Sequence, residues 1–279
     1  MAKIINGREM ALAIASRLKK KVSRRKDVPS LDIVLIGHLS ASEIYVNKKV
    51  DFGKEVGIKV NVHQLEPRVS LAKVKSLIGR LNAKKNNGII IQLPLPKKFS
   101  AYEIVNLVKA EKDMDGLTAI NQNRVFWHEV GILPAAARAV VHLLELAKVS
   151  WRGKKVALVG FSPLLGVPLL GWLIQKGATV NVTHRQTWHL DRETNRADVV
   201  ITATGIPRLI KAKHVKKSAV IIDIGISKYR GHISGDVDYD KVLPKAKFIT
   251  PVPGGVGPLT VAFLFDNLLH TKIKKIIKN

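Results

Sequence analysis

Tyr45 and Lys49, in the segment SASEIYVNKKV (residues 40–50), are two proton-bearing side chains spaced so that they could work together. Successive residues of a helix are turned by about 100°, so positions i and i+4 share a face, and Val56 continues that face as an apolar wall. A lysine desolvated between an aromatic ring and an apolar wall has a lowered pKa, which suits a general acid or base near neutral pH. Gly53 lies one turn ahead of Lys49, and we expect it to leave room for a ligand. This stretch alone is compatible with a catalytic lysine and with an accidental spacing.

Lys48 lies on the other side of the apolar stripe of the same predicted helix. Asp51 and Glu55 follow it at i+3 and i+7, so we expect a neutralised surface lysine. Short-chain dehydrogenases also use a Tyr-x-x-x-Lys pair, but theirs follows the glycine-rich nucleotide turn. Here the pair precedes the glycine-rich segment at 160–166, and this order excludes that family.

Polar side chains end two further segments of the N-terminal half. The segment IIIQLPLP (89–96) places Gln92 at the end of a predicted strand, and the prolines behind it fix a stiff turn. The carboxyl ends of parallel strands are where an α/β fold presents its site residues. The segment EKDMDGLTAIN (111–121) offers Asp113 and Asp115 in a predicted loop, either as site residues or as ordinary turn residues.

A loop rich in glycine and proline, ITPVPGGVGPLT (249–260), precedes the last apolar helix. Pro258 suits the first turn of that helix, whereas Gly254, Gly255 and Gly257 permit backbone conformations closed to other residues. Such a loop is not needed merely to connect two elements, so it indicates close backbone contact with a ligand.

Gly160 and Gly166, in VALVGFSPLLGVP (156–168), stand between a predicted strand and a predicted helix. An α/β fold binds the pyrophosphate of a dinucleotide at such a turn, because glycines let backbone N–H groups approach it. The spacing is not G-x-G-x-x-G, so a plain strand-to-helix turn is the alternative. The next strand ends in VTHRQT instead of Asp or Glu, and Arg185 there could bond a 2′-phosphate, which favours NADP over NAD.

Apolar runs alternate with helical patterns along the chain, which predicts an α/β fold with parallel sheets in two units, divided near residue 120. In the first unit we expect strands at 31–37, 57–65 and 87–96 and helices at 41–56, 70–85 and 100–110. In the second we expect strands at 154–160, 178–184, 197–205 and 218–225. We expect the N-terminal segment to form the first helix, and the last apolar helix to fold back on the first unit.

Composition limits the classes of function. The 279 residues, 46% of them hydrophobic, are enough to bury one large core or two ordinary ones. Cysteine is absent and the histidines lack metal-binding spacing, so disulfides, thiol chemistry and a metal site are not expected. The apolar segment LLGVPLLGWLI (164–174) is too short to span a bilayer and is broken by Gly and Pro. We therefore expect a cytoplasmic protein without a membrane partner.

The formal charge of +26 could indicate nucleic acid, an anionic membrane or an acidic small molecule as partner. The 47 lysines and arginines are spread along the chain, with local runs at 17–26, 211–217 and 272–278. We interpret these runs as solvated faces, so nucleic acid is the less favoured partner.

Motifs in the order of the chain resemble the bifunctional methylenetetrahydrofolate dehydrogenase/cyclohydrolase family: SASEIYVNKK, GIIIQLPLP, KDMDGLTAIN, VGFSPLLGVP, TVNVTHRQT, DIGI with GDVDY, and TPVPGGVGPLTVAFL. They span nearly the whole chain, and the last is highly specific. The resemblance implies a two-domain α/β fold and a homodimer. It implies an N-terminal folate-binding catalytic domain over 1–120, completed by a C-terminal helix over 258–279, and a Rossmann-type NADP-binding domain over 121–257.

The resemblance also implies an activity. Such enzymes oxidise 5,10-methylenetetrahydrofolate to the methenyl form with NADP and then hydrolyse it to 10-formyltetrahydrofolate, a part of one-carbon metabolism that serves purine and amino-acid biosynthesis. Lys49 would be the general acid or base, chiefly for hydrolysis, and Gln92 would hold and tune it. Tyr45 would stack on the aromatic part of the folate, and Asp115 would bind the donors of the pterin. The remaining contacts would be Pro253, Gly254 and Gly255 for the folate, and Gly160, Ser162, Gly166, Arg185, Thr204 and Ile226 for the cofactor, with no metal.

Two departures from the family pattern concern the cofactor side. Phe161 stands where an arginine often follows the glycine of the nucleotide loop, and residues 134–139 read PAAARA, without the hydroxyl, the second proline and the glycine common there. They leave open a cyclohydrolase with weak or NAD-linked dehydrogenase activity. An alternative of another class is an enzymatically decayed protein that binds nucleic acid or another polyanion.

Overall fold

The computed structural model describes residues 2–127, 129 and 131–270, and contacts divide it into two compact α/β units. Unit 1 comprises Met1–Ala11 and Ala136–Thr260, and unit 2 comprises Leu12–Ala135 and Val261–Asn279. This division falls later than residue 120, because the segment that follows 120 is bonded to unit 2. The side chain of Asn121 donates to the carbonyl of Ala110 at 2.8 Å and accepts from the N–H of Ile132 at 3.3 Å.

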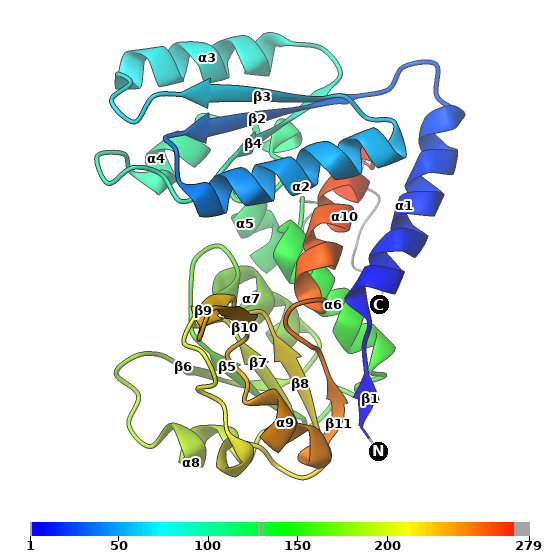
Figure 1. Cartoon of the computed structure of the whole chain (residues 1–279), viewed down its shortest axis with the longest axis vertical. Coiled ribbons are helices and arrows are strands. Elements are labelled where there is room, and N and C mark those ends of the chain that lie inside the picture. Colours follow the sequence, from blue (N-terminus) through cyan, green and yellow to red (C-terminus); the bar gives the residue numbers. More distant parts are fainter. Residues whose placement is uncertain (1, 128, 130, 271–279) are drawn as a thin grey trace. The chain divides into compact units, whose positions relative to one another are not determined.

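Unit 2 is built on a three-stranded parallel sheet of order β3-β2-β4. In Figure 1 this sheet is seen nearly edge-on, with α3 on one side and α2 on the other. Strands β2 and β4 are buried on both faces, which explains their continuous apolar sequence. The elements are β2 (Ser30–Ile36), α2 (Ser40–Val56), β3 (Val60–Leu65), α3 (Leu71–Ala83), β4 (Asn87–Ile91), α4 (Ala101–Val105), the 3-10 helix η1 (Ala110–Lys112) and α5 (Ala119–Phe126).

The last helix, α10 (Val256–Leu269), contributes its second half to unit 2, together with most of α1 (Gly7–Ser23). Phe265 of α10 is fully buried, and its ring centroid lies 5.1 Å from that of Phe52. The side chain of Asn267 donates to the carbonyls of Met114 and Leu133 at 3.0 and 3.2 Å. These contacts explain why the chain returns to unit 2 after completing unit 1.

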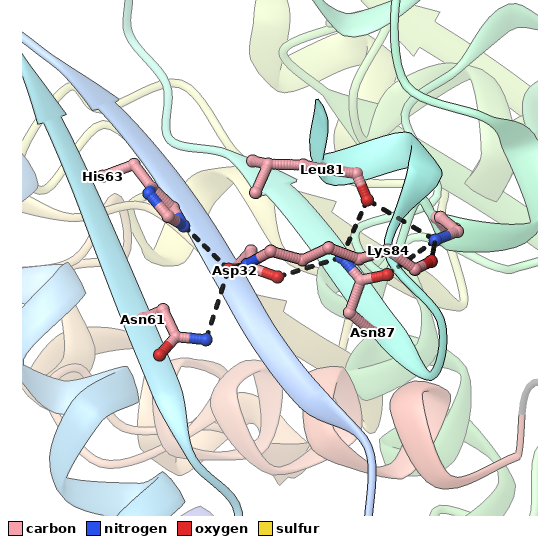
Figure 2. A network of polar contacts seen from close by, with 7 residues as sticks. Asp32, Asn61, His63, Leu81, Lys84 and Asn87 are labelled. Atoms are coloured by element: carbon pink, nitrogen blue, oxygen red, sulfur yellow. Dashed lines mark hydrogen bonds and ion pairs between the residues drawn. The ribbon is translucent and has the colours of Figure 1, made fainter. Parts of the chain in front are cut away.

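A buried polar network joins the amino ends of the three strands of unit 2 (Figure 2). Asp32 of β2 has no exposed surface. Its Oδ1 accepts from His63 at 2.7 Å, Lys84 at 2.9 Å and Asn61 at 3.2 Å, and its Oδ2 accepts from Asn87 at 2.9 Å. Burial alone would raise the pKa of Asp32, but the hydrogen bonds from His63, Lys84 and Asn87 outweigh it and hold that pKa below its usual value.

Unit 1 contains a six-stranded parallel sheet of order β1-β11-β8-β7-β5-β6. The chain passes from β5 outward to β6 and then returns to β7 on the other side of β5, which is the strand reversal where such folds bind ligands. The strands are β1 (Lys3–Ile4), β5 (Lys155–Val159), β6 (Thr179–Thr183), β7 (Val199–Thr202), β8 (Ala219–Asp223) and β11 (Ala246–Ile249), and a separate hairpin is formed by β9 (Ser227–Tyr229) and β10 (His232–Ser234). The helical elements are α6 (Ala135–Leu146), α7 (Gly166–Gln175), α8 (Leu190–Thr194), α9 (Tyr239–Val242), and the 3-10 helices η2 (Ala212–His214) and η3 (Leu243–Lys245).

All seven expected strands and the expected α/β class are present, but several limits differ. The strand expected from 57 begins at Val60, because Gly57 in a left-handed conformation (φ 79°) caps α2 and the chain needs two more residues to enter the sheet. The strand expected to reach 96 ends at Ile91. The helix expected over 100–110 is the short α4 followed by η1.

The N-terminal segment does not begin as a helix, since Lys3 and Ile4 first pair with β11 of unit 1. The apolar segment 164–174 forms α7. Within the described residues, no helix has the length and apolar character needed to cross a bilayer. Residues 271–279, which include the basic run at 272–278 and the end of the expected helix over 258–279, lie outside the described residues.

Candidate active site and cofactor-binding loops

Lys49 is buried on α2, with 8% of its surface exposed, and its Nζ donates a hydrogen bond to Oε1 of Gln92 at 2.9 Å. Its neighbour Lys48 is exposed, and the Nζ of Lys48 lies 5.3 Å from the centroid of the Tyr45 ring. Helical phase therefore predicted correctly which lysine is buried. The contact also confirms that Gln92 lies within reach of Lys49.

Gln92 follows β4 and presents its amide oxygen to Lys49 in a fixed orientation. Its backbone N–H donates to the carbonyl of Val34 at 2.9 Å, so the sheet positions the residue. Its side-chain Nε2 donates to the carbonyl of Leu93 at 2.8 Å, which leaves Oε1 as the acceptor for Lys49. The sheet and the carbonyl of Leu93 thus direct the amide oxygen of Gln92 at the buried amine.

Burial lowers the pKa of Lys49, and the negative charge of Asp115 opposes this shift without cancelling it. Burial also raises the pKa of Asp115, where the charge of Lys49 acts in the opposite direction and that of Asp113 adds to the rise. Part of the Asp115 side chain still reaches solvent, but its surroundings are mostly protein. Both groups are therefore shifted toward their neutral forms, so either can exchange a proton closer to neutral pH than it would in water.

The two aspartates of the segment 111–121 have separate tasks. Asp113 is buried, and its Oδ2 accepts from the backbone N–H of Thr118 at 2.7 Å and from the side chain of Asn121 at 3.0 Å. Asp113 therefore organises the loop and the start of α5, as turn chemistry predicts. Asp115 is left as the carboxyl group that interacts electrostatically with Lys49.

Tyr45 and Ser42 precede Lys49 on the same face of α2. Tyr45 is half-buried, and burial raises the pKa of its hydroxyl. Ser42 is 2% exposed, and its Oγ has no hydrogen-bond partner within the part of the chain that the structure describes. Ser42 was not among the predicted site residues, although Tyr45 and Lys49 follow it at i+3 and i+7 on the same helix face.

Two expectations about the surroundings of the lysines were wrong. Asp51 does not neutralise Lys48, because it pairs with Lys54 at 3.7 Å. Gly53 does not leave room for a ligand, because a Cβ there would lie 2.4 Å from a methyl group of Val60. The glycine is instead required for the close packing of α2 against the segment that enters β3.

The loop over 251–255 belongs to unit 1 and has little space for side chains. Gly254 has a φ of 110°, a region that favours glycine. A Cβ on Gly255 would lie 2.6 Å from the carbonyl oxygen of Pro251, and one on Gly7 would lie 1.8 Å from the carbonyl oxygen of Gly255. Gly257 differs, since it lies inside α10 and nothing in the described part of the chain approaches it. The tight loop thus packs against the start of α1, which is one reason for its glycines.

Gly160 and Gly166 bracket the loop after β5, at the strand reversal of unit 1. Gly160 has a φ of 83°, and a Cβ there would lie 2.7 Å from the carbonyl oxygen of Ala203. Gly166 begins α7, and the ring of Phe161 packs against it. A Cβ on Gly166 would lie 2.6 Å from that ring. The carbonyl of Ser162 accepts from the N–H of Gly166 at 2.8 Å, so the loop folds as a compact turn onto the helix.

Arg185, Thr204 and Ile226 follow the three strands β6, β7 and β8. Arg185 and Ile226 are exposed and Thr204 is half-buried. With Gly160 after β5, they all stand beyond the carboxyl ends of adjacent parallel strands. The residues expected to contact the cofactor are therefore gathered along one edge of one sheet, whereas Lys49, Gln92 and Asp115 belong to unit 2.

The fold and these two groups of residues define a two-unit α/β protein with a buried lysine site in one unit and a Rossmann-type strand edge in the other. Residues 5–115 match the family model of the tetrahydrofolate dehydrogenase/cyclohydrolase catalytic domain, and residues 134–276 match that of the corresponding NAD(P)-binding domain. The chain belongs to the tetrahydrofolate dehydrogenase/cyclohydrolase family.

Relatives and solved structures agree with this assignment over nearly the full length. The bifunctional protein FolD of Methanosarcina barkeri is 40% identical over 273 residues, which are 96% of this chain and 95% of the relative. The crystal structure of the bifunctional enzyme FolD from Campylobacter jejuni has a TM-score of 0.94 at 33% identity, covering 97% of this chain and 98% of that one. The Trypanosoma brucei enzyme, complexed with NADP cofactor and inhibitor, has a TM-score of 0.92 at 31% identity and covers 97% of both chains.

Proposed function

We infer that this chain catalyses two successive reactions: the NADP-dependent oxidation of 5,10-methylenetetrahydrofolate to 5,10-methenyltetrahydrofolate, and the hydrolysis of the latter to 10-formyltetrahydrofolate. Family membership over both domains supports this function, as do relatives named bifunctional that span the whole chain. The observation that carries the proposal is the buried amine of Lys49, held by Gln92 and faced by Asp115.

Hydrolysis is the step that needs this amine. The methenyl substrate is cationic, and water attacks its methenyl carbon. As the new carbon–oxygen bond forms, the water loses a proton, which the neutral Nζ of Lys49 can accept. The hydroxyl group of this adduct then loses its remaining proton to solvent as its oxygen becomes the formyl carbonyl. At the same time the bond from this carbon to N5 breaks and the protonated Lys49 returns its proton to N5, so the formyl group stays on N10. A lysine of lowered pKa serves both transfers, and its neutral form does not repel the cationic substrate.

Other expected site residues would bind and orient the folate. In this proposal Tyr45 stacks its half-buried ring on an aromatic part of the substrate. Asp115 accepts hydrogen bonds from the pterin, and its nearness to Lys49 supports a place beside the reacting carbon. Pro253, Gly254 and Gly255 would also contact the folate, and at the two glycines only main-chain atoms are available for these contacts.

Oxidation needs geometry more than acid or base, since NAD(P), when bound, would supply the acceptor for the hydride that the substrate loses. The strand edge of unit 1 fits such a cofactor, because Gly160 and Gly166 bracket a compact turn at the strand reversal, where an α/β fold binds a pyrophosphate. Ser162 and Thr204 offer half-buried hydroxyl groups along the same edge. These residues, with Ile226, would hold the cofactor in place for hydride transfer.

Arg185 is the residue on which NADP preference would depend. It is exposed at the end of β6, where a guanidinium group can make charge-assisted bonds to a 2′-phosphate. Phe161 is 43% exposed and its ring packs against Gly166, but it offers no positive charge to a 2′-phosphate. We therefore propose NADP as the cofactor, with NAD as the alternative that the uncharged Phe161 keeps open.

Assays of the purified protein test the proposal. Formation of methenyltetrahydrofolate is followed with NADP and with NAD, and its hydrolysis is followed separately. We expect both reactions, with higher kcat/KM for NADP than for NAD. A protein that hydrolyses the methenyl compound but turns over faster with NAD would support the alternative. A protein that hydrolyses none, and binds DNA or RNA in a salt-dependent manner, would support the polyanion binder, which the matches across both enzyme domains do not favour.

A homodimer and a cytoplasmic location are further parts of the proposal, supported by the family resemblance. Light scattering on the purified chain would show about twice the mass of 30.8 kDa for a dimer. A mass that stays at the monomer value at assay concentrations would contradict it.

A further inference from the structure

Asp223 and Asp236 are two buried carboxyl groups of unit 1 that neither reaction requires. Asp223 ends β8 and is 2% exposed, and Asp236 follows β10 and has no exposed surface. The hairpin of β9 and β10 lies between them in the chain, so both aspartates stand at the base of this hairpin. Carboxyl groups are rarely buried to this degree without partners, so their hydrogen bonds indicate why they are buried here.

Asp223 closes the base of the hairpin through backbone donors. Its Oδ1 accepts from the N–H of Gly225 at 2.9 Å and from the N–H of Asp236 at 3.1 Å. Its Oδ2 accepts from the N–H of Val237 at 2.9 Å. Asp223 thereby fixes the chain on both sides of the hairpin, and one of its donors directly precedes Ile226.

Asp236 ties the end of β7 to the same place. Its Oδ2 accepts from the hydroxyl of Thr202 at 2.8 Å and from the backbone N–H of Thr204 at 2.6 Å. The backbone continues the attachment, since the N–H of Ile210 donates to the carbonyl of Asp236 at 2.9 Å. The position of Thr204 is therefore set by Asp236.

Each carboxyl group also packs against a glycine near the other. A Cβ on Gly225 would lie 2.0 Å from Oδ1 of Asp236, and a Cβ on Gly235 would lie 2.1 Å from Oδ2 of Asp223. No other residue type fits either position without moving a carboxyl group. The segments at 223–225 and 235–237 are thus interlocked by hydrogen bonds and shape.

Burying these two carboxyl groups together lowers the stability of the fold. Burial raises the pKa of Asp223 to about 7, and the charge of Asp236 adds to the rise, although backbone N–H groups oppose it. Oδ1 of Asp236 has no hydrogen-bond partner among the described residues. Buried groups with such costs persist in a fold where position matters more than stability.

We propose that Asp223 and Asp236 are positioning residues for the bound cofactor: they hold the backbone at Thr204 and Ile226 along the carboxyl edge of the sheet of unit 1. This rests on the proposed function, in which Thr204 and Ile226 contact NAD(P). Neither aspartate need touch the cofactor, because each acts through the main chain that carries those contacts.

Asp236→Ala and Asp236→Asn form the first test. Alanine removes both acceptors, whereas asparagine keeps an oxygen for Thr202 and Thr204. We expect alanine to raise the KM for NADP about tenfold. Dehydrogenase kcat at saturating NADP and cyclohydrolase kcat/KM, measured on the same preparation, are expected to stay within about twofold. Asparagine is expected to restore the KM of the wild type.

Thr202→Val and Thr194→Val form a matched second test, which remains decisive if Asp236→Ala does not fold. Both threonines are fully buried in unit 1 and each donates one hydroxyl hydrogen bond, Thr202 to Asp236 and Thr194 to the carbonyl of Leu190 at 2.9 Å. We expect only Thr202→Val to raise the KM for NADP, by about threefold. Equal KM values in the two variants would overturn the proposal.

Two other results would also overturn it. One is a wild-type KM for NADP in a folded Asp236→Ala protein. The other is an equal fall of both activities, which a merely structural role predicts. Wild-type protein that uses neither NADP nor NAD would instead refute the proposed dehydrogenase function itself, so the two failures are distinguishable.

Discussion

Asp32 and Lys49 are buried charged residues of the same unit, placed at opposite ends of its three-stranded sheet. Asp32 lies near the amino ends of the strands and accepts hydrogen bonds from four side chains (Figure 2). Lys49 is held by Gln92, which follows the carboxyl end of β4, through one hydrogen bond to a neutral amide. Both side chains are buried, but among the described residues Asp32 has four hydrogen-bond partners and Lys49 has one.

Both pKa values are lowered, but the consequence for the charged form is opposite. The pKa of Asp32 is lowered, so its charged form is favoured, whereas the pKa of Lys49 is lowered, so its charged form is disfavoured. Burial by itself therefore does not mark an active site. A charge that its surroundings satisfy stabilises the fold, and a charge that they leave poorly satisfied is available for proton transfer.

The largest expected effect is the loss of hydrolysis in Lys49→Met. Removal of a general acid or base costs about 10²- to 10⁴-fold in rate, so we expect kcat for methenyl hydrolysis to fall by about 10³. Lys48→Met is the matched control and is expected to stay within about twofold, because its side chain is exposed. Similar losses in the two variants would contradict a specific role of the buried lysine in hydrolysis.

Asp32→Asn is expected to affect stability and leave catalysis unchanged. The substitution removes the charge from a buried network that contains His63 and Lys84, which costs about 3 kcal/mol of unfolding free energy. Urea denaturation measures this loss, and kcat for hydrolysis should stay within about twofold of the wild type at temperatures where the variant is folded. A catalytic defect in folded Asp32→Asn would show that the two ends of the sheet are not separable.

Gln92→Met tests whether the hydrogen bond from Lys49 to Gln92 tunes the pKa of the lysine. Methionine fills a similar volume but removes the acceptor from the buried amine, so we expect about a tenfold lower kcat for hydrolysis. Loss of an acceptor disfavours the charged amine further, so the ionisation of Lys49 in the pH–rate profile should move to lower pH. A shift to higher pH would contradict the hydrogen bond as the tuning interaction.

The smallest effect is a pH dependence of stability. The folded-state pKa of Asp32 lies below 3.8, so its contribution is fully present above about pH 5 and is lost as the pH falls through the folded value. The difference in unfolding free energy between wild type and Asp32→Asn should therefore be constant near neutral pH and shrink below about pH 4. A difference that grows on acidification would have the wrong sign.

Sequence patterns predicted the burial of candidate site residues where local geometry decides it. The phase of a helix is set by its own residues, so the burial of Lys49 and the exposure of Lys48 were predictable. The role of Gly53 was not, because the atoms that require a glycine there belong to Val60 and Ile58, in the segment after the helix ends. The sequence likewise gives no hint that Lys3 and Ile4 form a strand, since a two-residue strand has no periodicity and exists only beside β11.

The interlocked carboxyl groups Asp223 and Asp236 show the same limit at a longer range. Both lie in segments that carry the family resemblance, DIGI and GDVDY, yet neither was expected to have a role. Their importance comes from contacts with Thr202, Thr204 and each other's glycines, which join the ends of β7 and β8 to the base of the β9–β10 hairpin. Spacing along the chain cannot predict such contacts before the sheet order is known.

The most direct test of the central claim is the pH dependence of kcat/KM for methenyl hydrolysis, corrected for the uncatalysed reaction, in wild type, Lys48→Met and Lys49→Met. If neutral Lys49 accepts the proton of the attacking water, the rate rises with pH through an ionisation below 10.5 in wild type and Lys48→Met. That rise should be absent in Lys49→Met. The same rise in Lys49→Met would contradict the assignment of Lys49 as the proton acceptor.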